Sequence, residues 1–106
     1  MSENLLRILT EFRRGLEALY GPRLTDVVLF GSQARGEAGP ESDIDVLVVL
    51  KGAVDSGREI SRVSPLASSL SLAHDVVISC VYLSEDDLRG DPSPLLLNVR
   101  REGVRV

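Results

Sequence analysis

Two aspartates, Asp43 and Asp45, stand two residues apart at the start of an apolar, β-branched run. Successive side chains of a strand alternate between its faces, so both carboxylates would share one face, with Cα atoms about 7 Å apart. Such a pair binds hard cations, and magnesium is usually held by one or two carboxylates together with substrate phosphates. The spacing therefore predicts a magnesium site, although Asp-x-Asp alone also occurs at many solvated strand ends.

The pair Gly31-Ser32 has the complementary chemistry. It follows Asp26–Phe30, a short apolar run that predicts a buried strand. Glycine permits a tight turn and a close approach of phosphate to the backbone, and Ser32 is expected to N-cap one helical turn over Gln33-Ala34-Arg35. Free backbone N–H groups beside a hydroxyl form an anion site. A phosphate cradle next to paired carboxylates indicates metal-assisted phosphoryl or nucleotidyl transfer.

The segments before and between these motifs predict a sheet covered by helices. Apolar residues at helical spacing predict an amphipathic helix that ends at Gly21-Pro22: Leu5, Ile8, Leu9, Phe12, Leu16, Leu19 and Tyr20. Glu37–Glu41 is expected to be a loop before a second strand, Asp43–Leu50. Ser56-x-x-Glu59 matches a capping box for a helix that should kink or restart at Pro65.

The last third of the chain predicts one more central strand and a final helix. We expect His74-Asp75 to open a strand over Val76–Leu83, followed by an N-capped helical turn at Ser84–Asp87. Ser93-Pro94 should then start a helix that ends near Glu102, and the last three residues could add a short edge strand.

Connection rules bring the polar groups to one edge of this sheet. The helical connection makes the second and third strands parallel, so Asp43, Asp45 and Asp75 start neighbouring strands. The connection between the first two strands is too short for a parallel crossover, so the first strand should run antiparallel. Gly31-Ser32, at its end, would then meet the three carboxylates.

Composition limits the classes of function. A chain of 106 residues can build one core, so we expect a single domain over 1–106. The net charge of −4 argues against broad binding to nucleic acid. The longest apolar run, Val46–Leu50, is too short to span a membrane, and nothing resembles a signal peptide or a zinc-binding cluster. The single cysteine, Cys80, excludes an internal disulfide, is compatible with a cytoplasmic location and is expected to be a buried thiol.

The order of the motifs, Gly-Ser-x-Ala-Arg-Gly at 31–36 and Ser-Asp-Ile-Asp at 42–45, resembles the minimal nucleotidyltransferase (MNT) family of the DNA polymerase beta superfamily. The resemblance extends along most of the chain, including Ser93–Leu97 and Asn98–Val104. It implies an α/β (α+β) fold of the polymerase-beta type, with a small mixed β-sheet flanked by helices.

The resemblance also implies roles for the candidate residues. ATP would donate AMP to an acceptor hydroxyl, and Asp43 and Asp45 would hold two Mg²⁺ ions. Asp75 would complete the metal site and help to deprotonate the acceptor. Gly31 and Ser32 would hold the β- and γ-phosphates. Arg35 could neutralise phosphate, or it could form a salt bridge with a nearby loop glutamate, Glu37 or Glu41. His74, beside Asp75, is more readily explained as structural.

MNT proteins are typically paired with a helical HEPN protein in toxin–antitoxin modules, which implies an antitoxin that adenylylates its partner. One alternative is an antitoxin that neutralises its partner by binding alone. Another is transfer to a small molecule such as an aminoglycoside, although 106 residues leave no second wall for such a pocket. Leu95-Leu96-Leu97 could give apolar surface to a partner or be buried in the core.

Overall fold

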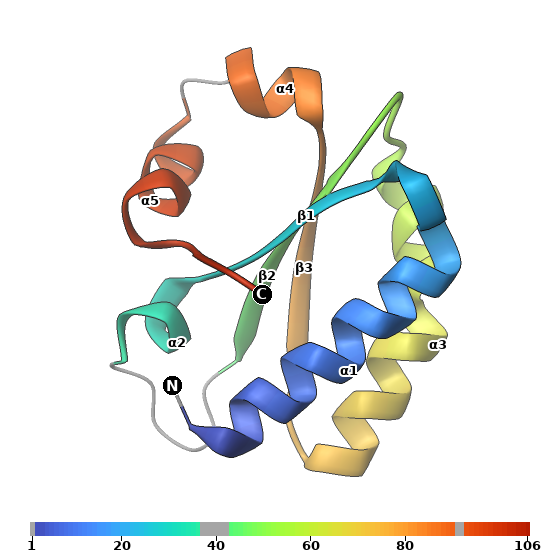
Figure 1. Cartoon of the computed structure of the whole chain (residues 1–106), viewed down its shortest axis with the longest axis vertical. Helices are drawn as coiled ribbons and strands as arrows, with labels where there is room; N and C mark the ends of the chain where they lie inside the picture. The colour runs from blue at the N-terminus through green and yellow to red at the C-terminus, as the bar shows by residue number, and fades with distance from the viewer. Residues whose placement is uncertain (1, 37–42, 91–92) are drawn as a thin grey trace.

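The computed structural model describes residues 2–36, 43–90 and 93–106. Helices and strands alternate along it, except that two short helices follow the third strand in succession (Figure 1). The elements are α1 (Glu3–Tyr20), the 3₁₀ turn η1 (Gly21–Arg23), β1 (Leu24–Phe30), α2 (Gly31–Arg35), β2 (Ile44–Leu50), α3 (Ser56–His74), β3 (Ile78–Ser84), α4 (Glu85–Gly90), α5 (Pro94–Glu102) and β4 (Val104–Arg105).

The strands form one mixed sheet in the order β3-β2-β1-β4. β1 and β2 are antiparallel, whereas β2 and β3 are parallel and are joined by α3. Both pairings confirm the expectation from connection lengths. The short edge strand β4 is also as expected and pairs antiparallel with β1. The mixed sheet with flanking helices confirms the predicted fold class.

Helices cover both faces of the sheet. α1 and α3 lie side by side on one face, and α5 packs on the other, near α2 (Figure 1). Each face buries its own aliphatic cluster. The first cluster centres on residues such as Phe12, Leu16 and Val46, and the second on Leu47 and Leu96. β2 contributes to both, because it is a central strand with two covered faces.

The N-terminus of α3 lies one residue earlier than the capping motif predicts. Asp55, not Ser56, is the N-cap: its carboxylate accepts the N–H of Arg58 at 3.1 Å. Glu59 reaches back to accept the N–H of Asp55 at 3.2 Å. The helix then continues through Pro65 as one element, so of the predicted kink or restart, the restart is wrong. Packing against α1 holds it together, since these two helices make extensive contacts.

The C-terminal helices begin where their serines predict. Ser84 accepts the N–H of Asp87 at 3.1 Å, and Ser93 accepts the N–H of Leu96 at 3.3 Å. In the leucine run of α5, Leu96 is buried, whereas Leu95 and Leu97 are 40% and 50% exposed. The prediction of core burial is therefore confirmed for Leu96, whereas Leu95 and Leu97 remain available to a partner. Of the helices described, none is both long and apolar enough to cross a membrane.

Candidate functional site

The end of β1 brings the backbone of Gly31 against the carboxylate of Asp45. The preceding residue, Phe30, is the cross-strand partner of Asp45 in the β1–β2 ladder. Gly31 has φ +75°, and a Cβ atom built on it would overlap Oδ2 of Asp45. Glycine is therefore required twice at this position, by its backbone conformation and by the space that the carboxylate occupies.

Asp43 and Asp45 form an electrostatically strained pair. Asp43 is exposed just before β2, and Asp45 is half-buried as the second residue of that strand. Burial raises the pKa of Asp45, and the negative charge of Asp43 raises it further. Like charges held together in this way are relieved by a cation. Two carboxylates beside an open backbone turn are oxygen donors of the kind that magnesium prefers, so the residues fit that ion.

Ser32 follows Gly31 in the first turn of α2, where the residue is half-buried. It does not serve as the N-cap, which corrects the prediction. The extended residue Phe30 occupies that position, because the helix starts immediately where β1 ends. The hydroxyl of Ser32 is therefore not bound as a helix cap. α2 ends after one turn at Gly36, which adopts the left-handed conformation.

Asp75 has a different structural place from the one expected. α3 continues through His74, and Asp75 is its C-cap, with φ +54°. The parallel ladder pairs Ile44 with Ile78, so Asp75 precedes this first pair by three residues and does not open the strand. In the described segments, no three acidic, histidine or cysteine side chains form a group that could hold a metal. The expected convergence of three carboxylates is thus absent from this structure.

Arg35 and His74 each pair with a residue distant in sequence. Arg35 Nη1 lies 3.2 Å from Glu102 Oε2 in α5, and both side chains are partly exposed. The loop glutamates that the sequence offered as partners, Glu37 and Glu41, lie outside the described residues. His74 Nε2 lies 3.2 Å from Glu11 Oε2 in α1, which supports its structural reading.

Ser79 is a neighbour of the carboxylate pair that the sequence reading missed. It is exposed and in register with Asp45 on the adjacent parallel strand, so the two side chains lie on the same face. Pairing register could have found it, but register depends on where β3 starts. The sequence predicts that start at Val76, whereas β3 begins at Ile78.

Burial raises the pKa of the Cys80 thiol to about 11. The sequence predicts a buried thiol, and the structure shows Cys80 partly buried in β3 and packed against the core.

A family model for the nucleotidyltransferase domain matches residues 9–90 of this chain. An inferred protein adenylyltransferase of Methanocaldococcus jannaschii is 36% identical over 75 residues, which are 71% of this chain and 75% of that protein. The solved structure of an inferred minimal nucleotidyltransferase superposes with a TM-score of 0.62 at 31% identity, covering 100% of this chain and 97% of that one. A mutant of the toxin–antitoxin MntA-HpeT gives a TM-score of 0.61 at 26% identity, covering 100% of this chain and 72% of that one.

Proposed function

Because this chain belongs to the nucleotidyltransferase domain family, as one of its minimal members, we propose that it transfers AMP from ATP to a hydroxyl group of another protein. One observation carries the proposal: the Asp45 carboxylate lies against the Gly31 backbone with the charge of Asp43 close enough to raise its pKa. The inferred activity of the Methanocaldococcus relative supports a protein as acceptor.

In the proposed reaction, the acceptor oxygen attacks the α-phosphorus of ATP. The bond from that phosphorus to the bridging oxygen breaks, and pyrophosphate leaves. Asp43 and Asp45 would hold magnesium, which when bound would neutralise charge on the transferring phosphate. The backbone at Gly31 and the hydroxyl of Ser32 would bind the β- and γ-phosphates, which leave together.

Two further residues have narrower proposed roles. Asp75 would accept the acceptor proton or add a carboxylate to the metal, once substrate draws it towards the pair. Arg35 would exchange Glu102 for a phosphate, since an exposed ion pair costs little to break. The assignments of Asp75 and Arg35 depend on movements that ATP would have to cause.

We propose a helical HEPN-type protein as the acceptor and an antitoxin role for this chain. The likeness to the MntA-HpeT toxin–antitoxin supports this partner. A second function, neutralisation by binding alone, is favoured by one observation: Asp75 does not join Asp43 and Asp45 in a metal-holding group.

The test combines the protein, Mg²⁺ and the product of the neighbouring gene with ATP labelled at the α- or the γ-phosphate. Label from the α-phosphate alone should appear on the partner, because AMP is transferred and pyrophosphate leaves. Asp43→Asn should abolish this labelling, whereas the matched change Asp86→Asn, at a 94% exposed side chain in α4, should not.

Partner toxicity separates the two functions. If Asp43→Asn loses labelling and still neutralises the partner fully, binding alone is the function. Labelling of an added aminoglycoside instead of the protein would overturn the proposed acceptor class.

A further inference from the structure

The outer side of β3 is an open sheet edge. β3 stands at one end of the strand order, and nothing in the described part of the chain pairs with its outer side. Ile44 donates its N–H to the carbonyl of Val77 at 2.8 Å, so the odd-numbered residues of this segment bond to β2. The backbone groups of Ile78, Cys80 and Tyr82 therefore face outward.

β3 lacks the features that usually keep an edge from pairing. Such edges are short or bulged, or they carry lysine or proline. β3 has seven residues, Ile-Ser-Cys-Val-Tyr-Leu-Ser, without charge or proline, and its register with β2 is unbroken. It is therefore ready to accept another strand.

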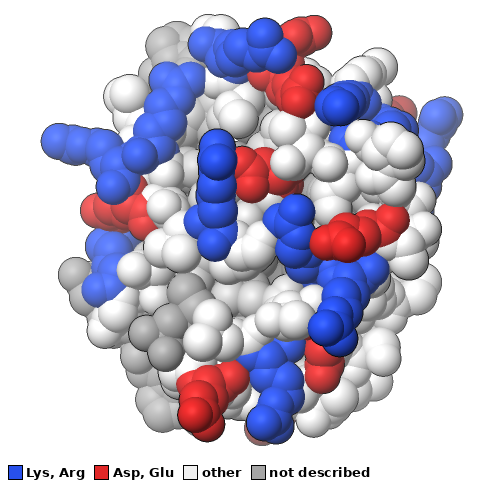
Figure 2. All heavy atoms as spheres, viewed as in Figure 1, with Lys and Arg blue, Asp and Glu red and all other residues white. Residues whose placement is uncertain are grey.

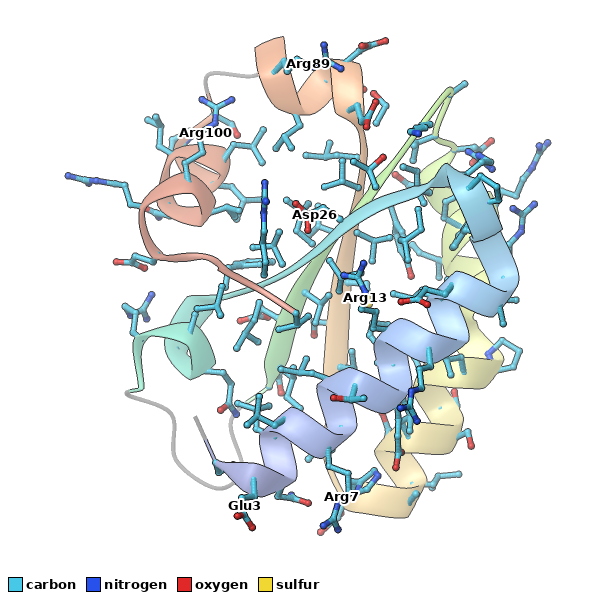
Figure 3. The ribbon with its side chains drawn as sticks, viewed as in Figure 1. Glu3, Arg7, Arg13, Asp26, Arg89 and Arg100 are labelled. Atoms are coloured by element: carbon cyan, nitrogen blue, oxygen red, sulfur yellow. The ribbon has the colours of Figure 1, made fainter. Side chains whose placement is uncertain are left out.

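The opposite edge is protected. β4 has two residues, and its Arg105 forms an ion pair with Asp26 of β1 at 2.9 Å. Arg13 of α1 donates to the carbonyl of Val106 close by, and the region around Arg13 and Asp26 is rich in polar side chains (Figure 3). Basic and acidic side chains are scattered over this face (Figure 2). The contrast indicates that the β3 edge is adapted to be covered.

A groove of about 730 Å³ lies between α3 and the β3 edge. Its margin exposes apolar side chains: Leu72 is 87% exposed, and Ile60 and Val77 are each 56% exposed. The polar residues that line it are mostly serines, and none of its lining residues is charged. Apolar surface gathered around one groove is typical of an interaction site.

We infer that this groove and edge are where two copies of the chain meet, with β3 of each copy pairing antiparallel in one continuous sheet. Charge is compatible with this occupant. Two copies that each carry −4 repel one another, and this repulsion is smallest where they meet through a face without charged residues, as in this groove. A twofold axis also makes an antiparallel strand edge complementary to itself. The inference rests on the fold and not on the proposed transfer reaction.

The backbone pattern sets a register for this pairing. Outward-facing residues bond to one another, so full overlap places Cys80 opposite Tyr82 of the second copy. Val81 then lies opposite Val81 of the second copy, in a non-hydrogen-bonded pair whose Cα atoms are about 4.5 Å apart. That separation falls within the range that a disulfide bridges.

Sedimentation equilibrium tests the assembly. The wild-type protein should sediment at twice its 11.5 kDa mass. Leu72→Glu should raise the dimer dissociation constant at least about tenfold, because each copy places a charge in an apolar contact. Leu97→Glu, at a 50% exposed leucine of α5 outside the groove, should leave it unchanged. Leu72 is so exposed that folding is not at risk, and melting curves check this.

Disulfide trapping tests the register. In a Cys80→Ser background, Val81→Cys should cross-link two copies under mild oxidation, whereas Leu83→Cys should not, because it faces Ser79 of the second copy. A wild-type protein that stays monomeric at millimolar concentration overturns the inference. So does a dimer that resists Leu72→Glu and does not cross-link through position 81.

Discussion

Two carboxylates, Asp45 and Glu59, sit in opposite environments. Glu59 is only 2% exposed, and both of its oxygens are bound: Tyr20 donates to Oε1 at 3.1 Å and the Asp55 N–H to Oε2 at 3.2 Å. Arg62 lies 3.7 Å away. Asp45 is less buried, yet its charge is opposed by burial and by Asp43. The more buried acid is the satisfied one, so burial alone does not identify a functional carboxylate.

The comparison separates two uses of an acidic side chain. Glu59 joins α1 to α3 through Tyr20, whose ring also lies 5.5 Å from the Arg62 guanidinium. Burial and the bond to Glu59 raise the pKa of Tyr20 to about 12, so its hydroxyl remains a donor. Asp45 instead carries a charge that the protein alone does not neutralise. A bound cation would supply the missing positive charge.

The largest expected effect separates the two acids by activity. Asp45→Asn should lower AMP transfer by at least about a thousandfold, because it removes a ligand of the ion that stabilises the transferring phosphate. Glu59→Gln, with the same change of charge, should lower transfer less than about threefold in the folded fraction, since it lies in a structural cluster. Equal losses in labelled transfer would contradict the distinction.

The next largest effect is on stability, where Glu59 matters more than Asp45. Glu59→Ala should cost about 3 kcal/mol in urea unfolding, because it leaves Tyr20 and the Asp55 N–H without their acceptor. Asp55→Ala, which removes only the helix cap, serves as the control and should cost about 1 kcal/mol. A Glu59→Ala variant as stable as wild type would show that the cluster contributes nothing.

A third effect concerns the glycine against Asp45. Gly31→Ala should destabilise the protein by about 2 kcal/mol, through the left-handed backbone and the collision with the carboxylate. Gly52→Ala is matched in conformation, with φ +82°, but a Cβ there meets nothing within 4 Å. It should cost about 1 kcal/mol, from the backbone alone. If Gly31→Ala and Gly52→Ala lowered thermal stability equally, the close approach of Asp45 to Gly31 would be contradicted.

The smallest expected effect is a gain in thermal stability. Without Mg²⁺ at neutral pH, Asp45→Asn should raise the melting temperature by a few degrees, because it removes an opposed charge. The raised pKa of Asp45 means that the folded state holds this proton more tightly than the unfolded state. The stability it gives is present at acid pH and is lost as pH rises through the raised pKa. The gain should therefore disappear below about pH 4.

Magnesium provides the control for that gain. Added Mg²⁺ should raise the melting temperature of the wild type and not that of Asp45→Asn. A variant that melts below wild type in the absence of metal would contradict the strained-pair reading.

Local sequence patterns predicted most of the fold and the residue types offered for the site. The alternation in Asp43-Ile44-Asp45 predicts that both acids share one face, and the charge of Asp43 does raise the pKa of Asp45. The serines before α4 and α5 mark where these helices begin. These features succeed because they depend on neighbours within four residues. The predicted place of Asp75 at the start of the strand was wrong for the same reason. Nothing in the local sequence shows that packing on α1 extends α3 through His74, so that Asp75 becomes its C-cap.

Sequence by itself determined the chemistry available here, a glycine–serine turn and two aspartates at strand spacing. Connection lengths also predicted the relative directions of the first three strands. Tertiary structure alone decided which groups meet. It brought Asp45 onto Gly31, set Ser79 beside Asp45, drew Arg35 to Glu102 and left the uncharged edge of β3 open. The physical reason is that spacing along a chain sets where a side chain points, whereas register and helix packing set what it touches.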